Sequence, residues 1–209
     1  MNAQKNGNRP DTVIFDVGNV LIEWRPEVLI GRLADSPEQA TFLERHVMNH
    51  HWFVQMDGGK TWATGVAERT RVYPEVADQI AAFNDRWMEA VPGAIEANVA
   101  VLEDLSASGC RLLGLTNFSS EKFAETRARF PFFTHFSDIL VSGNENLVKP
   151  DPAIYDLLLR RNALEAGQCV FVDDSAANIE AADALGIHTV HQLPDTDLRA
   201  VLAAMGLPI

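Results

Sequence analysis

The chain has 209 residues, and 17 Lys and Arg against 29 Asp and Glu give it a formal net charge of −12. Its 47% of hydrophobic and 22% of charged residues are ordinary for a globular protein and exclude a disordered or collagen-like chain. The negative charge disfavours nucleic acid and anionic membranes as partners, so an anionic ligand requires a local attractive site.

Five short apolar runs have the length and composition of β-strands. They are residues 12–15, 112–115, 138–141, 169–172 and 188–190. Helical patterns separate most of them, and alternating strands and helices predict a parallel sheet covered on both faces. We therefore expect an α/β fold with three layers, in which helices flank a parallel sheet.

Apolar residues also recur at helical spacing after the first strand. The segments are 95–105, 154–158, 181–185 and 198–205. Asp151 followed by Pro152 predicts the start of the second helix, since Asp caps a helix and Pro fits its first turn. Gly206 is placed to end the last helix.

Residues 24–91 show helical patterns and no convincing strand. Residues 36–39 resemble a capping box with proline in the first turn, and residues 76–91 carry an apolar stripe at helical spacing. Pro92 and Gly93 favour a hinge behind this segment. We expect a small all-helical domain from 24 to 91, inserted into a core made of residues 1–23 and 92–209.

Polar residues follow several of the predicted strands. Asp16 ends the first, Thr116 and Asn117 end the second, and Asp173 and Asp174 end the fourth. In a parallel sheet these strand ends meet at one edge, where ligands bind. One such residue often only caps the next helix, but three carboxylates placed together repel one another without a cation. Oxygen ligands in this number favour Mg²⁺.

Four segments, in this order, resemble the motifs of the haloacid dehalogenase-like hydrolase superfamily, of the type with a helical cap. They are FDVGNVL (15–21), LLGLTN (112–117), Lys149-Pro150 and CVFVDDSAANIEAA (169–182). The resemblance spans residues 13–187. It implies a Rossmann-like three-layer core, a small all-helical cap that sets specificity, and Mg²⁺-dependent hydrolysis of a phosphomonoester through an aspartyl phosphate.

The resemblance also implies roles for individual residues. Asp16 matches the nucleophile that attacks phosphorus. The residues that match the phosphate-binding groups are Thr116, Asn117 and Lys149. Of these, Thr116 and Lys149 also match catalytic residues. The residues that match the Mg²⁺ ligands are Asp16, Gly18 through its carbonyl, Asp173 and Asp174. A shared Mg²⁺ site requires Asp16 and Asp174 to lie within about 8 Å of each other.

One position departs from the usual pattern. Phosphatases of the superfamily usually have Asp-x-Asp where this chain has Asp16-Val17-Gly18, so the usual general acid, worth roughly 10²- to 10⁴-fold, is missing. Some sugar-phosphate phosphatases of the superfamily resemble this chain in having Asp-x-Gly-Asn-Val. Such an enzyme favours good leaving groups, as in an anomeric sugar phosphate. Glu23, seven residues after Asp16, is a candidate for the missing proton donor.

Three functions remain open. The favoured one is a phosphatase acting on a small phosphorylated metabolite such as a sugar phosphate. A metal-independent 2-haloacid dehalogenase is a second, although Asp173 and Asp174 would then have no purpose. The third is a nonenzymatic protein that binds a phosphorylated ligand or a protein partner, which leaves Lys149 and Thr116 unexplained.

The turn between two expected helices of residues 24–91 is the candidate substrate-contacting region of the cap. Trp52 or Trp62 could form a platform for a sugar face, and His51, Asp57 or Lys60 could bond its hydroxyls. In the alternative interpretation both tryptophans fill the cap core.

The sequence also bears on location and assembly. The polar opening segment and the lack of any apolar run of about 18 residues predict a cytoplasmic protein. Cys110 and Cys169 lie in or beside apolar runs, which favours free thiols. No nucleic-acid or membrane partner is expected, and no heptad pattern indicates more than a monomer or a homodimer.

Overall fold

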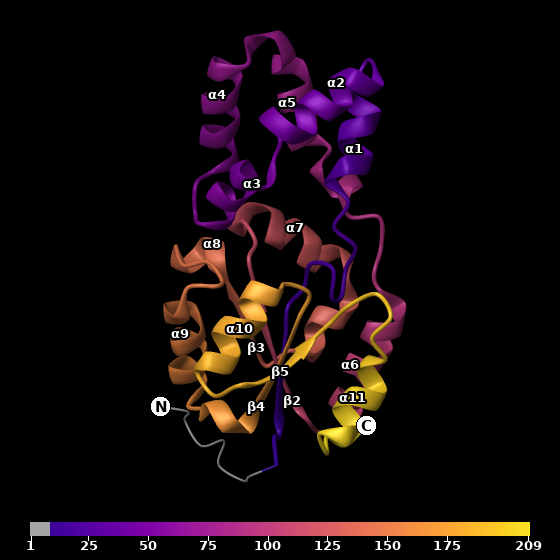
Figure 1. Cartoon of the computed structure of the whole chain (residues 1–209), viewed down its shortest axis with the longest axis vertical. Coiled ribbons are helices and arrows are strands. Elements are labelled where there is room, and N and C mark those ends of the chain that lie inside the picture. Colours follow the sequence, from indigo (N-terminus) through magenta and orange to yellow (C-terminus); the bar gives the residue numbers. More distant parts are fainter. Residues whose placement is uncertain (1–8) are drawn as a thin grey trace.

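The computed structural model describes residues 9–209, so residues 1–8 of the expected core segment lie outside it. Five parallel strands form a single sheet in the order β3-β2-β1-β4-β5 (Figure 1). Their bounds are Thr12–Phe15 (β1), Arg111–Thr116 (β2), Asp138–Val141 (β3), Cys169–Asp173 (β4) and His188–His191 (β5). The expected parallel α/β sheet is confirmed, and each strand overlaps its predicted run.

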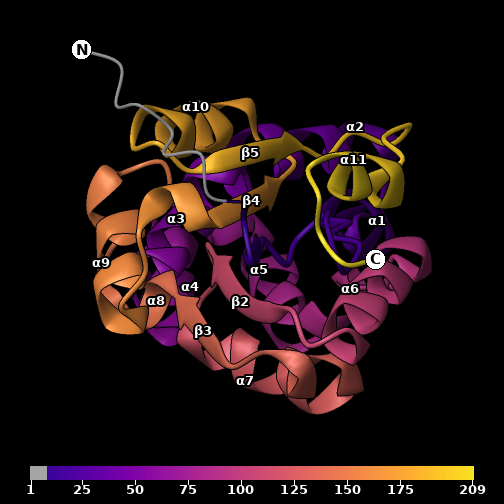
Figure 2. The same ribbon diagram turned by 90° about the horizontal axis from the view of Figure 1, so that it is seen from below.

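Helices cover both faces of the sheet, which gives three layers (Figure 2). Val13 and Phe15 of β1 pack on one face and Ile14 on the other, because side chains alternate along a strand. The first face carries α6 (Glu96–Ala107), α7 (Ser120–Arg129), a 3₁₀ turn at Pro131–His135 and α11 (Leu198–Ala204). The second face carries α9 (Pro152–Asn162) and α10 (Ala176–Ala184), with a 3₁₀ turn at Ala166–Gln168.

Local sequence signals account for several helix ends. Asp151 caps α9 by accepting the backbone N–H of Ala153 at 2.9 Å, and Pro152 opens the helix. Gly206 follows the end of α11 with φ +90°, a conformation that glycine adopts without strain. Between β3 and α9 lies a single short helix, α8 (Ser142–Glu145).

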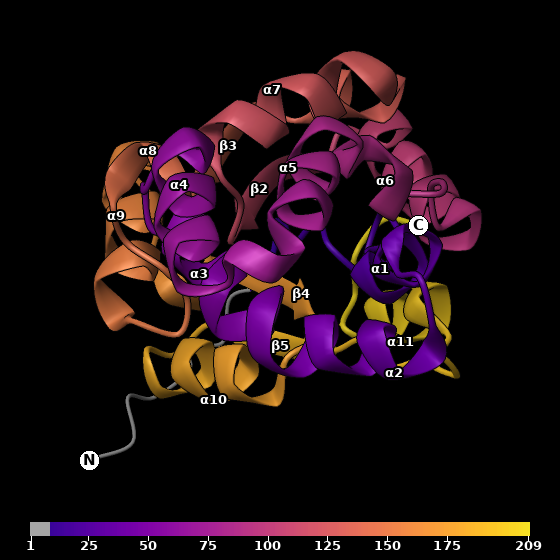
Figure 3. The same cartoon turned by 90° about the horizontal axis from the view of Figure 1, so that it is seen from above.

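Residues 24–91, which we call the cap, lie over the carboxyl ends of the strands (Figures 1 and 3). All of them are described, and their regular elements are helical. The elements are α1 (Pro26–Leu33), α2 (Pro37–Phe42), a π-helical turn (Leu43–Val47), α3 (His50–Asp57), α4 (Trp62–Val72), a 3₁₀ turn (Pro74–Val76), α5 (Ala77–Asp85) and a second 3₁₀ turn (Trp87–Ala90). The predicted stripe over 76–91 is buried, but it does not lie on one helix. It runs from the 3₁₀ turn that ends at Val76 through α5, which ends at Asp85, to the second 3₁₀ turn and Val91.

The two chain segments that join cap and core run side by side. The N–H of Glu23 bonds the carbonyl of Gly93 at 3.0 Å, and the N–H of Arg25 bonds that of Ala90 at 2.7 Å. The Arg129 guanidinium on α7 also donates to the carbonyls of Val91 and Pro92. No helix among residues 9–209 has both the length and the apolar character that crossing a bilayer requires.

Candidate active site

Three carboxylates meet at the carboxyl edge of the sheet. Asp16 follows β1, Asp173 ends the neighbouring strand β4, and Asp174 comes next. One carboxylate oxygen from each lies within 4.8 Å of the other two. Asp16 and Asp174 therefore meet the roughly 8 Å limit for a shared ion. Because β1 and β4 are adjacent in a parallel sheet, their polar end residues lie side by side, as the strand pattern predicts.

Lys149 reaches this cluster from the segment before α9. Its side chain is only 1% exposed, and its ammonium lies 2.9 Å from Asp16 Oδ1 and 2.7 Å from Asp173 Oδ2. Its third proton goes to the carbonyl of Leu115 at 2.9 Å. The ammonium therefore contacts three oxygens of the protein, and in this structure it holds the carboxylates of Asp16 and Asp173 close together.

Asn117 fixes the position of that lysine. Its side-chain amide donates to the carbonyl of Lys149 at 2.9 Å and accepts the backbone N–H of Lys149 at 2.8 Å. Sequence reasoning expected Asn117 to bind phosphate, but its side-chain contacts are to this backbone. Thr116 is buried, and its hydroxyl makes no hydrogen bond within residues 9–209, so it is a free donor at the end of β2.

Asp173 is fully buried, and protein donors occupy both of its oxygens. Oδ1 accepts from the N–H of Ser175 and from the Asn178 amide, and Oδ2 accepts from Lys149 and again from Asn178. Asp174 is half-buried. Of the two neighbours, Asp174 is the more available for direct contact with a cation.

The environment of Asp16 disfavours its charge. Burial raises the pKa of Asp16 to about 7. The positive charge of Lys149 lowers this pKa, and the negative charges of Asp173 and Asp174 raise it. Burial, followed by the charge of Asp173, also raises the pKa of Asp174. Burial opposes the charge of Lys149 as well, but Asp16 and Asp173 outweigh it and raise the lysine pKa.

The cluster fits a hard divalent cation. When ionised, three carboxylates and one ammonium leave two uncompensated negative charges, and every ligand atom on offer is an oxygen. Gly18, whose carbonyl is the expected backbone ligand, has no described atom within 4 Å of where a Cβ would stand. Its φ is outside the left-handed region, so neither backbone conformation nor crowding requires glycine there.

The expected substrate-contacting residues of the cap take different positions. Trp52 is 2% exposed and bonds the carbonyl of Gly65, inside the aromatic interior of the cap. Trp62 is 4% exposed, and its indole N–H donates to Ser119 Oγ on the core at 2.9 Å. Both indoles therefore fill the interior, as the alternative interpretation holds, and Trp62 also ties the cap to the core.

The polar candidates of the cap are spread over its surface and interior. His51 is exposed on α3, and Lys60 is engaged within the cap by Gln55 and Glu68. Glu23 is half-buried in the first connection. Asp57 differs from these, because burial raises the pKa of its carboxylate to about 7, against the opposing effects of the Ser119 backbone N–H and the charge of Lys149 on the core.

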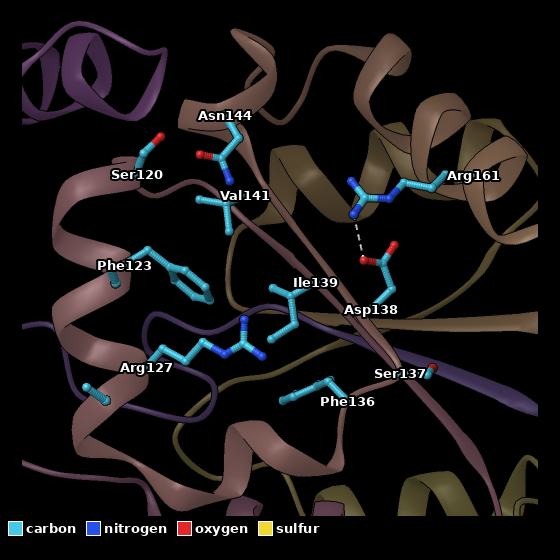
Figure 4. Close-up of a pocket in the computed structure, with 12 residues that line it drawn as sticks. Ser120, Phe123, Arg127, Phe136, Ser137, Asp138, Ile139, Val141, Asn144 and Arg161 are labelled. Atoms are coloured by element: carbon cyan, nitrogen blue, oxygen red, sulfur yellow. Dashed lines mark hydrogen bonds and ion pairs between the residues drawn. The ribbon is translucent and has the colours of Figure 1, made fainter.

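A groove of about 670 Å³ lies away from this cluster, beside the edge strand β3 (Figure 4). Phe123 and Arg127 of α7 face it from one side, Ile139 forms part of its floor, and Arg161 pairs with Asp138 at 2.9 Å on the other side. None of the site residues expected from the sequence lines it. The size of this groove therefore does not identify the active site, because the carboxylate cluster lies at the carboxyl ends of the strands.

The sequence is similar to those of known proteins. A family model described as haloacid dehalogenase-like hydrolase matches residues 10–186. The chain is 26% identical to mouse acyl-CoA dehydrogenase family member 10 over 99% of this chain but only 20% of that protein, so it spans about a fifth of that relative. It is 24% identical to the sesquiterpene phosphatase astK of Aspergillus oryzae, over 85% of this chain and 87% of the phosphatase.

Solved structures share the fold. A Bacteroides thetaiotaomicron HAD family enzyme in complex with magnesium and inorganic phosphate matches with a TM-score of 0.71 and 19% identity, covering 92% of this chain and 98% of that one. A dehalogenase matches with a TM-score of 0.68 and 16% identity, covering 97% and 99% of the two chains. At these identities the matches show a common architecture and leave the reaction open.

Proposed function

The chain belongs to the haloacid dehalogenase-like hydrolases, and from that membership we propose that it hydrolyses small phosphomonoesters with Mg²⁺ through an aspartyl phosphate on Asp16. One observation carries the proposal: Asp16 lies beside Lys149 and within 4.8 Å of Asp173 and Asp174. A carboxylate nucleophile in a net negative cluster needs a cation before it can approach a phosphate dianion. A phosphatase uses that cation, whereas a metal-independent dehalogenase leaves the acidic pair unexplained.

The residues support a two-step transfer. Asp16 Oδ1 is held by the N–H of Val17 at 2.7 Å and by Lys149, so Oδ2 is the oxygen that attacks phosphorus. The free hydroxyl of Thr116 donates to a phosphoryl oxygen. Asp16, Asp174 and the carbonyl of Gly18 would hold Mg²⁺, with Asp173 behind them, and the bound ion would neutralise charge on the phosphoryl group.

The substrate class follows from the cap. We propose that residues 24–91 form the specificity domain, attached at 23 and 92, and that a sugar phosphate or similar metabolite binds beneath it. One relative is a sesquiterpene phosphatase, so an isoprenyl monophosphate belongs in the test beside an anomeric sugar phosphate. We also propose a cytoplasmic location, since Cys110 and Cys169 are both unpaired.

The test is a panel of phosphomonoesters assayed with and without Mg²⁺, together with a 2-haloacid. We expect phosphate release that needs Mg²⁺ and is abolished by EDTA and by Asp16→Asn. Borohydride added during turnover should reduce the aspartyl phosphate and convert residue 16 to homoserine, which peptide mass spectrometry detects. Chloride release without metal would support the dehalogenase instead, and binding without turnover would support the nonenzymatic alternative.

A further inference from the structure

Asp57 lies where the cap meets the core, although it belongs to the cap. It is the last residue of α3, and its backbone carbonyl accepts the hydroxyl proton of Ser142 at 2.6 Å. The backbone N–H of Ser119 and the charge of Lys149 are near enough to its carboxylate to lower its pKa, against the larger effect of burial. Ser119 lies just beyond β2 and Ser142 just beyond β3, so both partners lie at the edge of the sheet that carries the catalytic cluster.

The loop that follows Asp57 also packs against the core and helps to fix the position of Asp57. Gly59 has φ +100°, and a Cβ there would stand 2.0 Å from the side-chain oxygen of Asn146. Gly58 approaches Val148, the residue before Lys149. The loop therefore packs against the segment that leads to the catalytic lysine, and Asp57 is presented to the core by fixed backbone contacts.

The other carboxylates of the site are already committed. Asp16 is the proposed nucleophile, Asp173 has both oxygens occupied by protein donors, and Asp174 is a proposed Mg²⁺ ligand. Gly18 has no side chain and leaves open space. Yet an alkoxide leaving group needs a proton as its bond to phosphorus breaks, and the water that attacks next must lose one.

We propose that Asp57 is the general acid and base of this site, an assignment that rests on the phosphatase function proposed above. In the first step Asp16 Oδ2 bonds to phosphorus, the ester P–O bond breaks, and the proton of the Asp57 carboxyl moves to the departing oxygen. In the second, water bonds to phosphorus and gives a proton to the Asp57 carboxylate, while the bond between phosphorus and Asp16 breaks. Inorganic phosphate leaves, and both side chains return to their starting states.

The protonation of Asp57 suits this role. Burial raises its pKa to about 7, and the Ser119 N–H and the charge of Lys149 limit the rise. A pKa near the working pH keeps both forms populated, which acid–base catalysis needs. The other charged side chains near Asp57 have partners of their own. On the cap, Lys60 pairs with Glu68. On the core, Glu121 accepts the N–H of Trp62, Lys122 pairs with Glu125, and Glu145 pairs with Arg161.

The test compares Asp57→Asn with wild type on phenyl phosphate, a poor leaving group, and on p-nitrophenyl phosphate, a good one. The substitution is isosteric. We expect kcat/KM to fall by about 10²- to 10⁴-fold on phenyl phosphate and by less than about threefold on p-nitrophenyl phosphate, because a good leaving group needs no acid. A burst of p-nitrophenol should appear in the variant, since water activation is slowed. The exposed Asp78→Asn on α5 is the matched control.

Equal losses on both substrates, or no loss on either, would overturn the assignment. So would a selective loss in Glu23→Gln with Asp57→Asn unaffected. A wild-type protein that hydrolyses neither ester contradicts the phosphatase function itself, which separates that failure from this one.

The wild-type enzyme offers a second measurement that does not depend on the folding of a variant. Its kcat/KM on phenyl phosphate should fall as pH rises above about 7, because the acid form of Asp57 is lost. On p-nitrophenyl phosphate this alkaline limb should be absent. The same alkaline limb on both substrates would contradict the proposal.

Discussion

Replacing Lys149 by Met tests whether the buried ammonium holds the carboxylates together. The lysine contacts Asp16 and Asp173 at 2.9 and 2.7 Å, and its side chain is 1% exposed. Removing one partner of a buried ion pair costs roughly 3–5 kcal/mol, because the remaining charge stays uncompensated. For a chain of this size about 1 kcal/mol shifts Tm by about 2–4 °C, so Tm should fall by about 6–20 °C at pH 8.

The defect should shrink in acid. The folded-state pKa of Asp16 is raised to about 7 from 3.8, so its protonated form favours folding below about pH 4 and that stabilisation is lost as pH rises through 7. Without Lys149 the pKa of Asp16 rises further, since the lysine lowers it. At pH 5 Asp16 is mostly protonated in both proteins, and the lysine contributes less.

Thermal unfolding followed by far-UV circular dichroism at pH 5 and pH 8, in metal-free buffer, measures both effects. Far-UV dichroism reports on the secondary structure of the whole chain, whereas all four tryptophans lie within residues 24–91. Lys60→Met is the control, because that lysine makes a partly exposed ion pair with Glu68 worth about 0–1 kcal/mol. A Lys149→Met protein within about 1 kcal/mol of wild type at pH 8, or equally destabilised at both pH values, would refute the reasoning.

Three further predictions concern the cation, the cap contact and the backbone. Saturating Mg²⁺, at about 100 times its Kd, should stabilise wild type by about 2.7 kcal/mol and Asp174→Asn clearly less, and a thermal shift of equal size in both would contradict the ligand assignment. Trp62→Phe removes the bond to Ser119 and should cost about 1 kcal/mol in urea unfolding. Ala163 has φ +53°, so Ala163→Gly should stabilise by about 1 kcal/mol in the same assay, and destabilisation would show that the strain is absent.

The periodicity of apolar residues and the residues at the ends of strands and helices were enough to predict the parallel sheet and its flanking helices. The apolar runs of β1, β2 and β4 became strands because their residues are buried on both faces of a parallel sheet, and Asp151 began a helix because capping is a local interaction. The meeting of Asp16 with Asp174 also followed from the sequence, since parallel strands bring their carboxyl ends to one edge. Local chemistry and the topology that it implies therefore determined the fold and the location of the site.

Only the tertiary structure decided what each polar group contacts. Asn117 binds the backbone of Lys149, the ammonium of Lys149 is shared among three acceptors, and the backbone carbonyl of Asp57 on the cap accepts from Ser142 on the core. The partners in these contacts are 24 to 133 residues apart along the chain, and no periodic pattern encodes such pairs. Burial, which raises the pKa values of Asp16 and Asp57, likewise depends on what packs around a side chain after folding.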